Sequence, residues 1–339
     1  MSFLEKAWYR KAGWLIALWP LSIFFQLLVS FRRWLQRIYS RPEHISIPIV
    51  VVGNITAGGT GKTPLTIALA RHLREKGFQP GIISRGYGGN AASYPMPVDA
   101  NDNTTEAGDE PVMIAAATGF PVVVGPDRNA ALQHLLATNE IDVVLSDDGL
   151  QHYKLYRDIE IAVVDGQRLF GNGLCFPAGP LREPISRLDS VDYVVVNGDN
   201  SAVHERAVVM EIEPKMFLNM ANGEKRSFSG APFNMGSTLQ AVCGIGNPER
   251  FFSVLEKLPY PIDRFSFPDH YNFTIEDFLN AGIDEKQPIV MTEKDAIKCK
   301  TFAKDNYWSL QVELNLPDFF LNEFTKKVKG FINLSDQEI

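Results

Sequence analysis

The sequence predicts an α/β protein with a mostly parallel sheet and helices on both faces, and three observations carry that prediction. Between residues 45 and 205, short β-branched runs alternate with patterns of helical spacing. The runs are almost unbroken in apolar residues, as strands buried on both faces are. A glycine-rich loop separates the first run from the first helical pattern. The expected strands are residues 47–53, 81–84, 121–125, 142–146, 160–165 and 192–196, and the expected helices among them are residues 64–76, 110–117 and 129–138.

Composition describes a folded protein and disfavours several classes of partner. The chain has 339 residues, 45% of them hydrophobic and 22% charged, which is enough for a large core and more than one domain. Its three cysteines are widely spaced, which argues against a disulfide framework or a zinc site and favours a reducing compartment. The net charge is −7, but residues 1–41 carry +6 and the remainder −13, so no nucleic-acid partner is expected for the body of the protein.

The N-terminal segment has the character of a membrane-associated helix. Residues 12–31 contain no charged side chain and are rich in aromatic and aliphatic residues, which by length alone would permit a span. Pro20 and polar residues interrupt the stretch, and basic residues flank it on both sides, so residues 1–40 are predicted to lie in the bilayer surface. A true span and a buried core helix are the alternatives. A cleaved signal peptide is disfavoured because no small-residue cleavage site follows.

The loop between the first strand and the first helix resembles a P-loop, with glycines that let backbone N–H groups turn towards the phosphates of a nucleotide. Lys62 would reach the β- and γ-phosphates, and Thr63 would offer its hydroxyl to Mg²⁺. The strict pattern has glycine in place of Thr56, and a glycine-rich turn before an ordinary helix is the alternative. The residues predicted to bind nucleotide here are Thr56, Ala57, Gly58, Gly59, Thr60, Gly61, Lys62 and Thr63.

Four expected strands lead into loops that carry polar residues. Ligands of a parallel sheet bind at the carboxyl ends of its strands, so these residues are candidates for a site. Asp147 and Asp148 stand where the acids of a Walker B sequence would hold Mg²⁺, and Arg128 offers a guanidinium to phosphates. The candidates are Arg85 and Tyr87 after residues 81–84, Arg128 after 121–125, Asp147 and Asp148 after 142–146, and Glu183 in the loop beyond 160–165.

The second half of the chain predicts a smaller α/β domain. Residues 211–219 and 225–228 read as two strands around Asn222-Gly223, with Pro232 and Gly236 as a hinge. The predicted division is a membrane-associated helix over residues 1–40, a P-loop domain over 41–210, a two-stranded linker over 211–235 and a smaller domain over 236–339. Two single residues are ambiguous by sequence: Asp109 could cap a helix, and a lone histidine such as His270 is more often structural than catalytic.

Read together, nine motifs resemble the tetraacyldisaccharide 4'-kinase family, and they cover essentially the whole chain. The motifs are V-V-V-G-N-I-T-A-G-G-T-G-K-T, S-R-G-Y-G-G, A-G-D-E-P, S-D-D-G-L-Q-H-Y, F-G-N-G, P-A-G-P-L-R-E, C-G-I-G-N-P-x-R-F-F, F-P-D-H and M-T-E-K-D-A-I-K. The resemblance implies a P-loop NTPase-like fold. It also implies ATP- and Mg²⁺-dependent phosphorylation of the 4'-hydroxyl of a lipid A precursor, at the cytoplasmic face of the inner membrane.

The resemblance assigns roles to residues of this chain. Asp109 and His270 would come from separate domains and form the catalytic base. The remaining roles fall to Lys62 and Asp147 as further catalytic residues, to Thr63, Asp148 and Glu183 as metal ligands, to Arg128, Gln151 and His152 at the nucleotide, and to Tyr87 and Arg85 on the substrate side.

A membrane-associated partition-type ATPase is the alternative function. It shares the sheet, the P-loop and sometimes a membrane-seeking helix. Such proteins carry a second lysine directly before the Gly-Gly pair, where this chain has Ala57. A GTPase metallochaperone would need an N-K-x-D motif and a Cys/His cluster, and the chain has neither.

Overall fold

The computed structural model describes residues 3–39, 45–199 and 201–335. It contains the strands and helices that the sequence predicts between residues 45 and 205, with bounds that differ by one or two residues. They are β1 (Ile49–Gly53), α3 (Lys62–Glu75), β2 (Pro80–Ser84), α5 (Asp109–Thr118), β4 (Val122–Val124), α6 (Arg128–Thr138), β5 (Val143–Ser146), β6 (Ile159–Asp165) and β7 (Tyr193–Asn197), together with the short strand β3 (Met96–Val98) and helix α4 (Thr104–Ala107).

The sheet of this half has β1 near its centre, between β5 and β6. Its order is β7-β6-β1-β5-β2-β4-β3, and all neighbours are parallel except the edge strand β3. Alternate residues of a strand point to opposite sides of the sheet, and helices cover both of these faces. Val50 and Val52 pack against α3 and α5, whereas Ile49 and Val51 pack against α6, and all four are fully buried. The predicted fold class is confirmed for this half.

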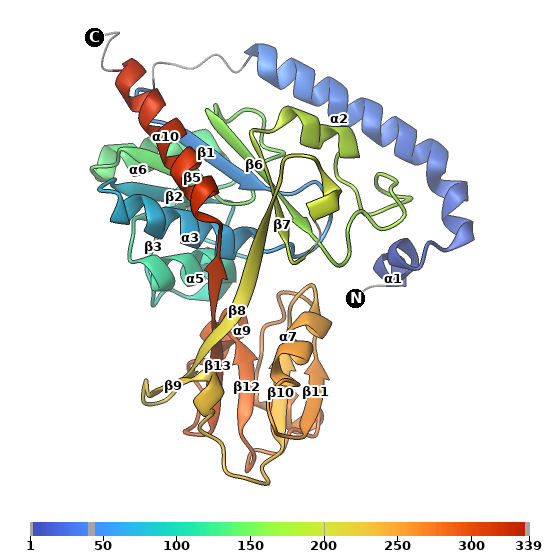
Figure 1. The fold of residues 1–339 in the computed structure, drawn as a ribbon, viewed down its shortest axis with the longest axis vertical. Coiled ribbons are helices and arrows are strands. Elements are labelled where there is room, and N and C mark those ends of the chain that lie inside the picture. Colours follow the sequence, from blue (N-terminus) through green and yellow to red (C-terminus); the bar gives the residue numbers. More distant parts are fainter. Residues whose placement is uncertain (1–2, 40–44, 200, 336–339) are drawn as a thin grey trace.

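A smaller parallel sheet forms the other half of the molecule. Its strands are β10 (Leu239–Cys243), β11 (Ile262–Ser266), β12 (Ile289–Thr292) and β13 (Tyr307–Asn315), in the order β11-β10-β12-β13. Helices α7 (Pro248–Leu255), α8 (Ile275–Asn280) and α9 (Glu293–Cys299) connect them. Figure 1 shows this half below the P-loop half, with the two long strands β8 and β13 running between them.

The strand that passes between the two halves is not the segment expected as the hinge. The hairpin exists, since β8 (Ala207–Asn219) pairs with β9 (Lys225–Ser227), but it lies within the smaller half, at the end of β8 away from β7. The chain passes between the halves along β8, which is parallel to β7 at its start and antiparallel to β13 over the rest of its length. Phe233, beside the expected hinge residue Pro232, is buried in the core of the smaller half with Phe217 and Leu239.

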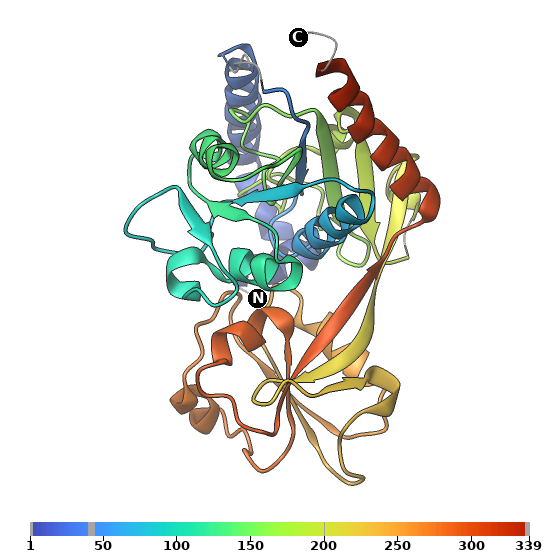
Figure 2. The ribbon, with the colours of Figure 1, turned by 90° about the vertical axis from the view of Figure 1, so that its left-hand side faces the viewer.

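The last helix, α10 (Asp318–Ser335), falls within the range expected for the smaller domain, residues 236–339, but packs against the P-loop half. Phe320, Phe324 and Val328 share a core with the β1 and β7 strands of the P-loop half. The ring centroids of Phe320 and Tyr193 are 5.2 Å apart. Spacing of four residues puts these three side chains on one helix face, which covers apolar residues of the large sheet that would otherwise be exposed. Figure 2 shows α10 alongside that sheet.

The N-terminal segment forms α1 (Phe3–Tyr9), a 3₁₀ turn (Gly13–Leu18) and α2 (Trp19–Tyr39). By length and composition, Gly13–Gln36 is the one helical segment among the described residues that could cross a bilayer. The buried-core alternative is wrong, because most of its large apolar side chains are exposed: Trp14, Ile16, Trp19, Leu21, Ile23, Phe24, Leu27, Leu28, Phe31 and Trp34.

One side of this segment attaches to the P-loop half. The hydroxyl of Ser22 is buried and donates to the carbonyl of Cys175 at 2.7 Å, and the Phe25 and Phe176 rings meet edge to face. Phe25 therefore faces the protein and not the solvent. Further towards the N-terminus, Trp8 of α1 belongs to a small apolar cluster that contacts Ala57 of the P-loop. The N-terminal segment therefore packs against the P-loop.

Candidate active site

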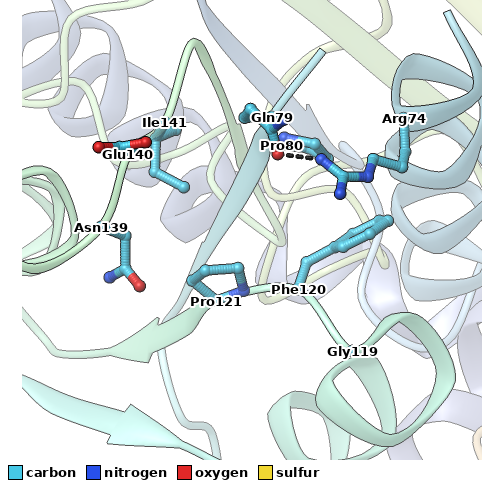
Figure 3. Close-up of a pocket in the computed structure, with 9 residues that line it drawn as sticks. All are labelled: Arg74, Gln79, Pro80, Gly119, Phe120, Pro121, Asn139, Glu140 and Ile141. Atoms are coloured by element: carbon cyan, nitrogen blue, oxygen red, sulfur yellow. Dashed lines mark hydrogen bonds between the residues drawn. The ribbon is translucent and has the colours of Figure 1, made fainter. Parts of the chain in front are cut away.

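Several of the predicted site residues line a cavity between the two halves. Its volume is about 860 Å³, and the P-loop from Ala57 to Thr63 lines one side of it. Asp148 and Tyr87 also line it from the P-loop half, and His270 lines it from the smaller half. A second hollow of about 240 Å³ lies at the opposite edge of the large sheet, near Pro80 and Pro121 (Figure 3). It contains none of the predicted site residues.

The P-loop conformation depends on glycine and on two asparagines that sequence analysis did not single out. Gly61 caps α3 with φ of 96°, and a Cβ atom there would lie 2.6 Å from the side-chain nitrogen of Asn197. That nitrogen donates to the carbonyl of Thr60 at 3.0 Å. The side chain of Asn54 donates to the carbonyl of Gly58 at 3.2 Å. These contacts fix the carbonyl groups of Gly58 and Thr60 in a loop whose residues line the cavity.

The two acids after β5 have different surroundings. Asp147 is completely buried, and its oxygens accept hydrogen bonds from Thr63 at 3.1 Å and from Thr66 at 2.8 Å. Burial raises the pKa of Asp147 to about 7. Asp148 lies 3.5 Å from the ammonium of Lys62 and 3.4 Å from the guanidinium of Arg182. Burial raises the pKa of Asp148, but these two charges outweigh it, and the pKa lies below its ordinary value.

Four further predicted residues lie beside or behind this pair. Arg128 is buried and donates to the carbonyl of Gly125 at 2.7 Å, and burial lowers its pKa to about 10. Burial also lowers the pKa of His152 to about 4, so its imidazole is neutral. Glu183 is buried: its oxygens accept hydrogen bonds from Gln151 at 2.8 Å and from Tyr153, and it forms an ion pair with Arg187 at 3.3 Å. The nucleotide and metal roles expected of these residues stay predictions.

Asp109 and His270 meet across the cavity. Asp109 is the first residue of α5 and only 5% exposed, and His270 follows β11 in the other half. The Nδ1 atom of His270 lies 3.0 Å from both oxygens of Asp109. The N-cap of α5 is Gly108, so capping does not account for Asp109. Arg85 and Tyr87, the two residues expected on the substrate side, lie on one loop and are both exposed. The centroid of the Tyr87 ring lies 4.8 Å from that of the His270 ring.

Two lysines of α9 complete this cluster, and sequence analysis gave them no role. The ammonium groups of Lys294 and Lys298 lie 3.7 and 3.8 Å from Asp109. Their spacing of four residues within the M-T-E-K-D-A-I-K motif places them on one face of a helix, which is the signal that could have found them. Burial raises the pKa of Asp109, but the hydrogen bond from His270 and the charge of Lys294 together outweigh burial. The pKa therefore lies below its ordinary value, and the carboxylate stays ionised.

The halves also touch on the other side of the cavity. A Cβ atom on Gly246, in the loop after β10, would lie 2.9 Å from the backbone nitrogen of Gly59. Arg168 donates to the carbonyl of Gly246 at 3.1 Å, and Asn247 donates to Asp165 at 3.4 Å. The smaller half therefore contacts the P-loop half both at the phosphate loop and at Asp109.

Comparisons with known proteins agree on one family. The family model described as tetraacyldisaccharide-1-P 4'-kinase matches residues 14–329. The tetraacyldisaccharide 4'-kinase of Nitrosococcus oceani is 49% identical over 322 residues, which cover 94% of this chain and 92% of that protein. The protein of the same name from Hahella chejuensis is 45% identical over 326 residues, with 94% of each chain covered.

A solved structure gives the same result for the fold. The crystal structure of the "apo" form of LpxK from Aquifex aeolicus in complex with ATP matches with a TM-score of 0.75 and 27% identity. The match covers 94% of this chain and 99% of that one. The predicted α/β fold class is confirmed.

Proposed function

The chain belongs to the tetraacyldisaccharide 4'-kinase family. We propose that it transfers the γ-phosphate of ATP to a lipid A precursor, and that this transfer takes place between the P-loop and Asp109. The acceptor is the 4'-hydroxyl of a tetraacyldisaccharide 1-phosphate. One observation carries this assignment to the site: the P-loop, Asp148 and His270 line one cavity, and behind its wall Asp147 bonds to Thr63 and Asp109 to His270. The reaction belongs to lipid A biosynthesis, and the partition-type ATPase is set aside.

We infer that the P-loop residues bind ATP, with Lys62 at the β- and γ-phosphates. The oxygens of Thr63 and Asp148, with Asp147 and Glu183 behind them, suit Mg²⁺, which prefers oxygen ligands and shares its shell with nucleotide phosphates. Among the described residues no three His, Cys, Asp or Glu side chains form a metal cage, so a partial protein shell is what this site offers. When bound, Mg²⁺ would supply positive charge against the phosphate oxygens.

Asp109 is the proposed proton acceptor. A sugar hydroxyl is too weak an acid to lose its proton unaided at neutral pH, so a positioned carboxylate helps. The 4'-oxygen forms a bond to the γ-phosphorus while the bond from that phosphorus to the bridging oxygen breaks. The hydroxyl proton goes to Asp109, and ADP leaves with the bridging oxygen. His270 would orient the carboxylate, since its Nδ1 contacts both oxygens.

The test of this function is product identity. Purified full-length protein is incubated with γ-labelled ATP, Mg²⁺ and a tetraacyldisaccharide 1-phosphate in mixed micelles. We expect the label in a lipid bis-phosphate that a 4'-specific structural analysis identifies. Label that accumulates only as free phosphate would contradict the proposal and revive the ATPase alternative.

Gly246→Ala should impair ATP turnover by keeping the loop after β10 away from the P-loop. The added Cβ would lie 2.9 Å from the nitrogen of Gly59, so the two loops must separate. Small misplacements of reacting groups slow a reaction strongly, so we expect kcat/KM for ATP to fall about tenfold or more. Gly330→Ala is the control, because a Cβ there meets open space. Equal kinetics for the two variants would show that ATP turnover does not depend on the contact between the halves at Gly59.

We further propose that α2 docks on the cytoplasmic face of the inner membrane and lies in the bilayer surface. Phe24, Leu27 and Phe31 stand on one helix face and are 66%, 65% and 58% exposed. Arg32 and, before the helix, Arg10 are exposed cations that suit an anionic surface. Arg33, which was also expected at the membrane, donates to the hydroxyl of Ser190 at 3.1 Å. The side chain of Arg37 lies outside the described residues, as does Arg41. The negative charge of the rest of the chain argues against a nucleic-acid partner.

The combined change Phe24→Ser, Leu27→Ser and Phe31→Ser should weaken flotation with vesicles that contain anionic lipid. The loss of apolar contact lowers partitioning, and salt should weaken what binding the unmodified protein shows. Substitution is preferable to removal of residues 1–40, because α1 packs against Ala57. Leu279→Ser with Phe319→Ser is a control on exposed apolar residues elsewhere. Equal flotation of both variants would exclude α2 as the docking surface.

A further inference from the structure

We propose that Lys294 is a positioning residue that fixes the proton on Nδ1 of His270 and keeps Asp109 ready to accept the substrate proton. This inference rests on the proposed function and adds a residue to it. Lys294 lies on α9 of the smaller half, and its ammonium reaches four groups at once. The distances are 3.1 Å to Asp269, 3.3 Å to Nε2 of His270, 3.5 Å to Glu110 and 3.7 Å to Asp109.

The tautomer follows from the neighbours of the two ring nitrogens. An ammonium group can only donate hydrogen bonds, and an ionised carboxylate can only accept them. Lys294 faces Nε2, so Nε2 must be the acceptor and carry no proton. The proton then lies on Nδ1, which donates to both oxygens of Asp109.

The charges around Asp109 make Lys294 the cation on which the cluster depends. Three carboxylates lie close together: Asp109 and Glu110 from α5, and Asp269 from the loop after β11. Lys298 also faces Asp109 but lies nearer to Asp295, at 2.8 Å. Lys294 is shared by all three acids. Burial lowers the pKa of Lys294, but the charges of Glu110, Asp109 and Asp269 raise it well above its ordinary value, so the side chain stays charged.

Removing the charge should therefore change the chemistry of the base as well as the contact between the halves. Without Lys294 the pKa of Asp109 rises, because one of the charges that lowers it is lost. The active form has an ionised Asp109, so activity should be lost at a higher pH as the solution is acidified. Nε2 of His270 would also lose the donor that holds it as an acceptor, so the proton on Nδ1 would no longer be fixed.

The test compares Lys294→Met, Lys294→Arg and Lys300→Met as full-length proteins. We expect Lys294→Met to lower kcat about tenfold or more with little change in the KM for ATP, and to move the acid limb of the pH profile upward. Arginine keeps the charge and should return the limb to its original position. Lys300 also bridges the halves, donating to Asn101 at 2.9 Å, but is not among the residues that contact Asp109, so its variant should match the unmodified enzyme. Lys294→Gln serves if the methionine variant does not fold.

A spectroscopic readout separates positioning from support of the fold. In protein labelled with ¹⁵N-histidine, the His270 signals, assigned with His270→Gln, should show a protonated Nδ1 and an unprotonated Nε2, and Lys294→Met should alter that pattern. An unmoved acid limb, or losses equal to those of Lys300→Met, would overturn the inference. If the unmodified enzyme makes no 4'-phosphorylated lipid, the proposed function fails; product formation with an unmoved limb removes only the role of Lys294.

Discussion

Replacing Lys62 by alanine should lower kcat by roughly 100-fold or more, because phosphoryl transfer depends on neutralising charge at the β- and γ-phosphates. Lys62 is the first residue of α3, is buried and lines the cavity. Its ammonium lies 3.5 Å from Asp148, so it also holds that carboxylate before nucleotide binds. The variant loses both interactions, and the loss should appear mainly in kcat.

The measurement is initial-rate kinetics of lipid phosphorylation, with thermal unfolding recorded beside it to show that the fold is intact. Lys76→Ala is the matched control, since Lys76 is an exposed lysine at the other end of the same helix. A folded Lys62→Ala protein with nearly normal kcat would exclude residues 56–63 as the phosphate-binding loop of this enzyme.

Local patterns were enough to predict the large sheet and the glycine-rich loop that precedes α3. The strands around β1 are short and buried on both faces, so their apolar residues are nearly continuous and easy to recognise. The polar residues that follow them converge because parallel strands end at one edge of a sheet. Asp147 and Asp148 lie beside Lys62 and Thr63 for that reason.

Contacts between distant parts of the chain were not predictable in the same way. The spacing of Phe320, Phe324 and Val328 shows that α10 has an apolar face, but nothing local says that the face returns to the P-loop half. The passage between the halves was placed near Pro232, because a β-hairpin has a sequence signature and a long strand shared by two sheets has none. Lys294 could be noticed only as part of a motif, since its role depends on a helix from the other half.

Backbone conformation adds a signal that sequence does not show. Four described residues other than glycine adopt positive φ, and two of them, Asp148 and His270, belong to the site, with φ of 48° and 59°; the other two are Lys11 and Leu169. Side chains other than glycine rarely occupy this region, and such residues gather at functional sites. One belongs to the acidic pair beside the P-loop and the other to the pair with Asp109, so both halves of the proposed site hold a residue in a strained conformation.

Asp109→Ala and His270→Ala should each lower kcat by about 100-fold with a modest change in the KM for ATP, and the double variant should be little worse than the poorer single one. The reason is their contact: Nδ1 of His270 lies 3.0 Å from both oxygens of Asp109, so each residue works through the other. Residues that act as one unit give effects that do not add.

A complete double-mutant cycle measured with both substrates checks this expectation, with His134→Ala as the control for loss of a histidine outside the cavity lining. The pH profile adds a second test. The pKa of Asp109 is lowered in the folded protein, mainly by the hydrogen bond from His270 working against burial, so the acid limb of His270→Ala should move to higher pH. Losses that multiply in the double variant, or unaltered turnover in His270→Ala, would assign His270 to the structure of its loop and leave Asp109 to act alone.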